Sequence, residues 1–136
     1  MIVLDTSAVI ALLLGEPSAR ALANRLAADS ERVMSVASYL EAGTVIAGRH
    51  SDRLGVVDFL DAYLADAGIE LRPVDEAQIR IALDARIRYG RGMGHGGVLN
   101  FGDAFSYALA KSLDAPLLYV GRDFVTTDVK SAADQS

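Results

Sequence analysis

Short apolar runs alternate with longer amphipathic segments along the whole chain. Four runs have the length and the branched apolar residues of buried strands, at residues 2–4, 32–35, 69–74 and 117–120. Apolar residues recur at helical spacing between them, over residues 6–14, 19–28, 36–47, 52–67, 76–89 and 101–110. Strands separated by helices predict an α/β fold, a three-layer α/β/α sandwich around a short, mainly parallel sheet.

Glycine and proline mark the ends of these segments. Gly15 with Pro17 ends the first helix, and Gly68 stands where a C-cap glycine is expected. Residues 90–97 hold five of the twelve glycines, which predicts an exposed loop on the substrate side. In the helix before that loop, the apolar residues at helical spacing predict a buried stripe, made of Ile79, Ala82, Leu83 and Ile87.

The length and composition favour one globular domain inside the cell. We expect a single domain over residues 1–130 and a polar tail over residues 131–136, whose composition is typical of disordered termini. No apolar run approaches the roughly 20 residues that span a bilayer, and Asp5 interrupts the N-terminal apolar run too early for a signal peptide. We therefore expect a cytoplasmic protein with no membrane segment. The absence of cysteine excludes disulfides, thiolate nucleophiles and cysteine zinc sites.

The net charge of the chain limits which parts of its surface could bind nucleic acid. Thirteen basic and eighteen acidic residues give a net charge of −5, which argues against a surface that attracts nucleic acid everywhere. A nuclease is still compatible with this balance if some of the acids bind Mg²⁺, because the metal ion offsets their charge locally.

Four carboxylates stand at the ends of predicted elements. Asp5 and Asp123 follow predicted strands, while Glu41 and Asp103 lie near the N-termini of predicted helices, Glu41 in the second turn of its helix. In parallel α/β sheets, ligands gather at the carboxyl ends of the strands, so we expect these four acids at one edge. Each also has an ordinary structural interpretation, since Asp caps helices and Gly-x-Asp forms turns.

Acids gathered in this way predict metal-assisted chemistry. Neighbouring carboxylates repel one another and titrate as a coupled set, and a hard divalent cation relieves that repulsion. Mg²⁺ prefers oxygen ligands, and paired ions stabilise the attacking and leaving oxygens of a phosphodiester displacement. The hydroxyls of Thr6 and Ser7, beside Asp5, are able to cap the helix or to orient a ligand.

Four stretches of the chain together resemble a known family. They are MIVLDTSA at residues 1–8, SYLE at residues 38–41, LNFGDAFSYALA at residues 99–110 and LLYVGRDFVTTDV at residues 117–129. In this order and spacing they resemble a PIN-domain ribonuclease, specifically a VapC-type toxin of a type II toxin–antitoxin pair.

The resemblance implies an endoribonuclease that depends on Mg²⁺ or Mn²⁺, commonly a homodimer, held inactive by a cognate VapB-type antitoxin. Asp5, Glu41 and Asp103 match the first three acids of the family site, and Asp123 matches the fourth. Asp128 is a fallback for the fourth position. Ala104 stands where related chains often carry Cys, a packing position without chemistry.

Three other functions compete with this interpretation. A catalytically weak PIN domain that binds RNA or a protein partner would keep the fold without the cleavage. A haloacid-dehalogenase-type phosphatase needs a second Asp two residues after the first, where this chain has Ser7. A receiver-type signalling domain is disfavoured because no matching Lys follows the last strand.

Overall fold

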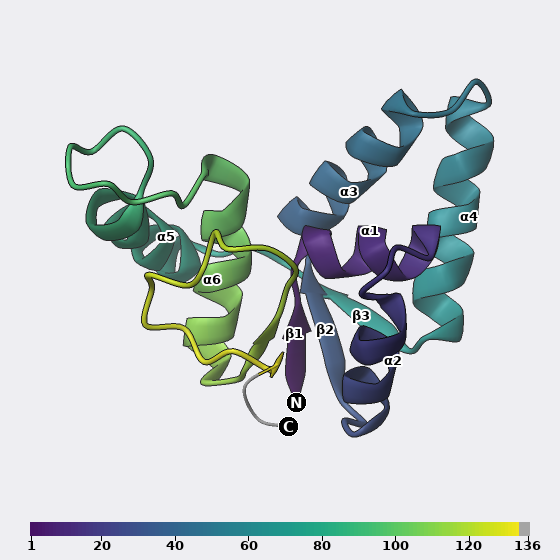
Figure 1. The fold of residues 1–136 in the computed structure, drawn as a ribbon, viewed down its shortest axis with the longest axis horizontal. Helices are drawn as coiled ribbons and strands as arrows, with labels where there is room; N and C mark the ends of the chain where they lie inside the picture. The colour runs from purple at the N-terminus through teal and green to yellow at the C-terminus, as the bar shows by residue number, and fades with distance from the viewer. Residues whose placement is uncertain (134–136) are drawn as a thin grey trace.

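A four-stranded parallel sheet divides the protein into two helical layers (Figure 1). The computed structural model describes residues 1–133. The strands are β1 (Ile2–Leu4), β2 (Arg32–Ser35), β3 (Ile69–Arg72) and β4 (Leu117–Leu118). The helices are α1 (Thr6–Leu14), α2 (Ala19–Ala27), α3 (Val36–Gly48), α4 (Arg53–Asp66), α5 (Glu76–Tyr89) and α6 (Phe101–Leu113).

The sheet has the order β3-β2-β1-β4, and each neighbouring pair is parallel. Strand β1 is therefore central. The chain moves outward on one side of β1 to form β2 and β3, and it returns to the other side only with β4. The predicted three-layer α/β/α sandwich is confirmed.

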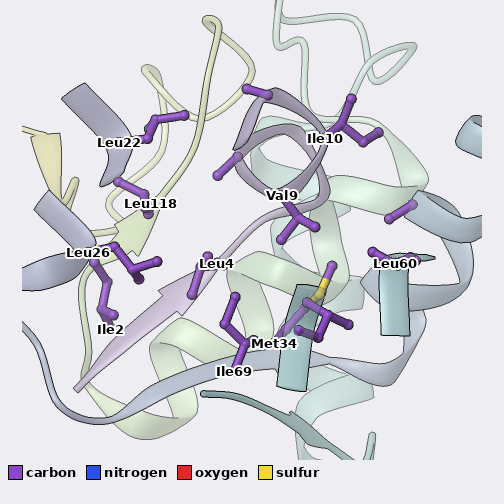
Figure 2. Packing of buried hydrophobic residues seen from close by; sticks show 14 of the residues in the cluster. Ile2, Leu4, Val9, Ile10, Leu22, Leu26, Met34, Leu60, Ile69 and Leu118 are labelled. Atoms are coloured by element: carbon purple, nitrogen blue, oxygen red, sulfur yellow. The ribbon is translucent and has the colours of Figure 1, made fainter. Parts of the chain in front are cut away.

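Alternating side chains of the short strands enter two separate cores. Ile2 and Leu4 pack with the cluster under α1 to α4, whereas Val3 between them packs with the cluster under α5 and α6. Figure 2 shows Leu4 among side chains from α1, α2 and β2. Because successive strand residues point to opposite faces, apolar residues at every position of β1 require helices on both sides.

Helix α5 packs through small residues and not through the predicted stripe. Its buried positions include Ala82 and Ala85, while Ile79, Leu83 and Ile87 are 45%, 61% and 55% exposed. The predicted buried stripe is correct for Ala82 and wrong for the other three residues. The small alanines face α6, where Ala104 and Ala108 belong to the same core cluster, so these two helices approach closely.

The glycine-rich segment forms the predicted exposed loop. Its base is closed by two backbone hydrogen bonds, from Arg91 N to Leu99 O at 3.0 Å and from Leu99 N to Tyr89 O at 3.1 Å. Residues 91–96 between these bonds are exposed.

The packed chain continues past the predicted domain boundary at residue 130. The amide of Ala132 donates to Leu117 O at 2.9 Å, and the Ala132 side chain is fully buried. The first residues of the predicted tail are thus part of the domain, and residues 134–136 lie outside the described residues. None of the helices within residues 1–133 has the length and apolar character needed to cross a membrane.

The packing of α4 generates a stability prediction. Leu60 is fully buried in the cluster with α1 and α3, whereas Leu54 on the same helix is 83% exposed. We expect Leu60→Ala to lower the free energy of unfolding by about 2–5 kcal/mol, because it removes buried methyl groups and leaves a cavity. Urea denaturation measures the change. Leu54→Ala is the matched control, with an expected change within about 0.5 kcal/mol, and equal losses in both variants would contradict this packing.

Candidate active site

The carboxyl ends of β1 and β4 meet where the chain reverses its direction across the sheet. Asp5 directly follows β1, and its amide donates to Leu118 O at 2.9 Å. The Ser7 hydroxyl accepts a hydrogen bond from Val120 N at 3.0 Å, which joins the segments that follow the two strands. Ligands in open parallel sheets bind at this kind of reversal point, outside the carboxyl ends of the strands.

The Asp5 carboxylate is buried and held from two sides. Its side chain caps α1, and the residue is 3% exposed. Ser106 donates its hydroxyl to Oδ1 at 2.6 Å, while Ser7 donates its hydroxyl and its amide to Oδ2 at 2.6 and 3.0 Å. Burial raises the pKa of Asp5, and the hydrogen bonds from Ser106 and Ser7 oppose that rise. These donors fix the orientation of the carboxylate.

Two of the hydroxyls around Asp5 were missed in the sequence. Ser38 and Ser106 are 1% and 0% exposed, and their Oγ atoms are 2.8 Å apart. The hydroxyl of Thr6 donates to Ser38 O at 2.9 Å, so α1, α3 and α6 are tied together beside Asp5. The available sequence signal was a lone serine at position 106, one turn after Asp103 in an otherwise apolar stretch.

Asp103 serves as a cap of α6 and also lies among other acids. The Asn100 side chain accepts from Asp103 N at 2.8 Å, and Asp103 Oδ2 accepts from Asn100 N at 2.9 Å, which completes a capping box. Asp103 is 6% exposed. Burial raises its pKa to about 8, and the negative charges of Asp5 and Asp123 add to that rise, as does a hydrogen bond with Asp123.

The two candidates for the fourth acid have different surroundings. Asp123 interacts with Asp103 through the hydrogen bond and the charge repulsion described above. Asp128 instead accepts a hydrogen bond from the Tyr107 hydroxyl and pairs with Lys111 Nζ at 3.1 Å. These two partners hold the pKa of Asp128 below its usual value. The structure therefore brings Asp123 to Asp103 and ties Asp128 to the side of α6.

Glu41 reaches the start of α6 because residue 102 has no side chain. A Cβ atom at Gly102 would lie 2.2 Å from Glu41 Oε2. The carboxylate of Glu41 thus packs directly on the first turn of α6, one residue before Asp103. The two histidines have other partners, since His50 Nδ1 lies 2.7 Å from Ile46 O and His95 Nε2 lies 3.0 Å from Ile87 O.

The donor set suits a hard divalent cation. The predicted acids offer only oxygen ligands, and the mutual repulsion of Asp5, Asp103 and Asp123 is of the kind that a cation relieves. Within residues 1–133, no three acidic or histidine side chains converge tightly enough to enclose an ion by themselves. Mg²⁺ is commonly held by one or two carboxylates and several waters, so these residues fit a water-rich site better than a closed cage.

The comparisons with known proteins agree with this architecture. The profile of the PIN domain family matches residues 2–130. Ribonuclease VapC28 of Mycobacterium tuberculosis is 45% identical over 134 residues, which cover 98% of each chain. Ribonuclease VapC of Mycolicibacterium smegmatis is 46% identical over 127 residues, which cover 93% of this chain and 96% of that one.

Solved structures share the fold at low sequence identity. VapC20 of Mycobacterium tuberculosis, described as a Sarcin-Ricin loop cleaving toxin, has a TM-score of 0.75 at 17% identity, over 95% of this chain and 96% of that one. A chain of VapBC2 from Rickettsia felis, bound to a promoter DNA fragment, has a TM-score of 0.75 at 16% identity, over 96% of each chain. By family profile, sequence identity and fold, this chain belongs to the PIN-domain family and, within it, to the VapC ribonucleases.

Proposed function

We propose that this protein is a divalent-metal-dependent endoribonuclease that acts as the toxin of a toxin–antitoxin pair in the cytoplasm. The observation that carries the proposal is geometric: Asp5 and Asp103 are buried together at the reversal point of the sheet. Burial raises the pKa of Asp103, and the charges of Asp5 and Asp123 add to that rise, as is typical of a functional site. Nearly full-length relatives named as VapC ribonucleases support the choice of RNA as substrate.

Asp5, Asp103 and Asp123 are the residues that would hold Mg²⁺ or Mn²⁺, with Glu41 beside them. When bound, the ion supplies charge stabilisation at the phosphodiester and lowers the pKa of water for the attack. The chain supplies orientation, because Ser7 and Ser106 fix the Asp5 carboxylate and the capping box fixes Asp103.

Two protein partners belong to the proposal. One is a VapB-type antitoxin, since a related solved structure from Rickettsia felis is a VapBC2 complex. The other is a second copy of this chain. The exposed apolar line Ile79, Leu83 and Ile87 on α5 runs beside a line of alternating charges, formed by Glu76, Arg80, Asp84 and Arg88.

That arrangement of α5 is self-complementary in an antiparallel pair. A two-fold axis near Leu83 places Ile79 of one copy opposite Ile87 of the other. It also places Arg80 near Asp84 of the other copy, and Glu76 near Arg88, so opposite charges meet along the apolar contact.

Removal of single acids tests the nuclease. We expect protein freed of antitoxin to cleave single-stranded RNA with Mg²⁺ or Mn²⁺, and Asp5→Asn and Asp103→Asn each to lower kcat at least about 100-fold, since the ion contributes several kcal/mol. Gel assays of RNA cleavage, with the cut ends mapped, measure the rate of cleavage by each variant. We expect Asp123→Asn to lower kcat as well.

Asp128→Asn is the matched control, because Asp128 bonds to Tyr107 and Lys111, away from the acids around Asp103. We expect it to leave cleavage within a few-fold of wild type. Cleavage that survives the Asp5 and Asp103 substitutions, or that persists in excess chelator, would contradict the proposed metal-dependent mechanism. A wild-type protein that binds RNA without cutting it would favour the catalytically weak PIN domain.

The raised pKa of Asp103 predicts a pH-dependent stability. Native Asp103 keeps its proton up to about pH 8, whereas the unfolded carboxyl loses it near 3.8. The unfolded state then binds fewer protons in this window, so the free energy of unfolding of the metal-free protein decreases as the pH rises through it.

Thermal unfolding at about pH 5 and about pH 9, with and without excess Mg²⁺, measures this dependence. We expect Mg²⁺ to raise the Tm more at the higher pH, where the carboxyl is free to bind it. Asp103→Asn is expected to flatten both dependences. An equal Mg²⁺ effect at both pH values would count against metal binding by Asp103.

The α5 surface is tested by the mass of the protein in solution. We expect wild type to run as a dimer in light scattering coupled to size exclusion, and Leu83→Glu to run as a monomer, because the substitution places two like charges on the two-fold axis. Leu54→Glu, at an exposed leucine of α4, is the matched control and should stay dimeric. A dimer that tolerates Leu83→Glu would rule out this surface.

A further inference from the structure

A cavity of about 490 Å³ lies beside Glu41, between the start of α3 and the start of α6. Its wall includes Glu41 and Gly102, the contact pair at the first turn of α6. Apolar side chains form most of the remaining wall, namely Leu40, Phe101 and Phe105. The cavity thus shares Glu41 with the candidate active site, and most of the rest of its wall is apolar.

The aromatic pair in this wall is ordered and presents a free ring. Phe101 is 71% exposed, although it lies in the first turn of α6, two residues before Asp103. Phe105 is half-buried one turn later, and the two rings meet edge to face with centroids 5.2 Å apart. This contact holds the Phe101 ring in place while most of its surface stays open to a ligand.

Leu40 adds a second exposed apolar side chain, at 69%, from the opposite helix. Single exposed apolar residues are ordinary on protein surfaces. Here two of them face one cavity whose polar wall is a carboxylate of the candidate site. Asn100 also lines the cavity, and its side-chain oxygen is engaged in the capping box, which leaves its amide nitrogen as a donor.

We propose that this cavity is a nucleobase subsite, in which the Phe101 ring stacks on an unstacked base of the RNA next to the cleaved phosphodiester. The inference rests on the proposed ribonuclease function. RNA held at the acids has to present its neighbouring base to the adjoining wall, and single-stranded RNA is commonly bound by stacking splayed bases on aromatic side chains.

The carboxylate in the wall favours a base over an apolar protein side chain as the occupant. An apolar protein side chain seated in the cavity would cover Glu41 without offering it a partner, and burial of an unpaired charge is costly. A base has an apolar face for Phe101 and a polar edge for Asn100, and its backbone arrives with the cation that the acids attract.

The test measures stacking at one nucleotide. The probe is a single-stranded RNA 12-mer that carries one 2-aminopurine, whose fluorescence is quenched on stacking, moved along the strand in successive probes. Binding is measured with Mg²⁺ in the Asp5→Asn background, in which the proposed mechanism slows cleavage at least about 100-fold. We expect Phe101→Ala to weaken binding by roughly 5- to 100-fold and to abolish the quenching at one position of the strand. Phe101→Trp should preserve both.

Two controls separate stacking from general damage. Phe59→Ala removes another exposed phenylalanine, 58% exposed on α4 and outside this cavity, and should leave binding unchanged. An RNA made abasic at the quenched position should bind equally well with and without the Phe101→Ala substitution, because the base that stacks is missing.

The outcomes also separate this inference from the nuclease itself. If wild type fails to cut RNA but Phe101→Ala abolishes the quenching, the subsite stands and the nuclease proposal fails. If wild type cuts RNA and Phe101→Ala changes neither KM nor quenching, the subsite is overturned alone. No binding of the probes, or a Phe101→Ala effect confined to association with a protein partner, also overturns the subsite.

Discussion

The burial of carboxylates close to one another is the constraint on which this structure depends. Asp5 and Asp103 are almost inaccessible to solvent, and both lie where the sheet reverses its strand order. Burying them costs free energy, and the fold offsets that cost with serine hydroxyls at Asp5 and a capping box at Asp103. The offset is incomplete, as the raised pKa of Asp103 shows. A buried carboxylate whose charged form is only partly stabilised in the folded protein is typical of a functional site.

The approach of Asp5 and Asp103 to one another was predictable from the sequence because each of the two marks a local boundary. A short apolar run ends at Asp5, and an apolar helix starts around Asp103, so simple parallel topology is enough to bring the two together. The hydroxyls of Ser38 and Ser106 were not predictable in this way. They meet across 68 residues of sequence, through the packing of α3 on α6, which no local pattern records.

Periodicity failed where it could not distinguish one apolar surface from another. In α5 the large residues Ile79, Leu83 and Ile87 form the regular pattern, yet the core is reached by Ala82 and Ala85. Small residues let two helices approach closely, and their weak apolar signal is easily outweighed by larger side chains on another face. The last strand was also predicted too long. It ends at Leu118, and the amide of Val120 bonds to the Ser7 hydroxyl rather than to a strand.

The capping box fixes the orientation in which the Asp103 carboxylate is presented to a ligand. One carboxylate oxygen is committed to the amide of Asn100, and a hydrogen bond to Asp123 restrains the same side chain. Rotation about the last side-chain bond is therefore arrested when α6 folds. The conformational entropy of orienting this group is lost once, during folding, and not again at each binding event. Asp103 is in this sense preorganised, and the helix that it caps is the part of the protein that holds it ready.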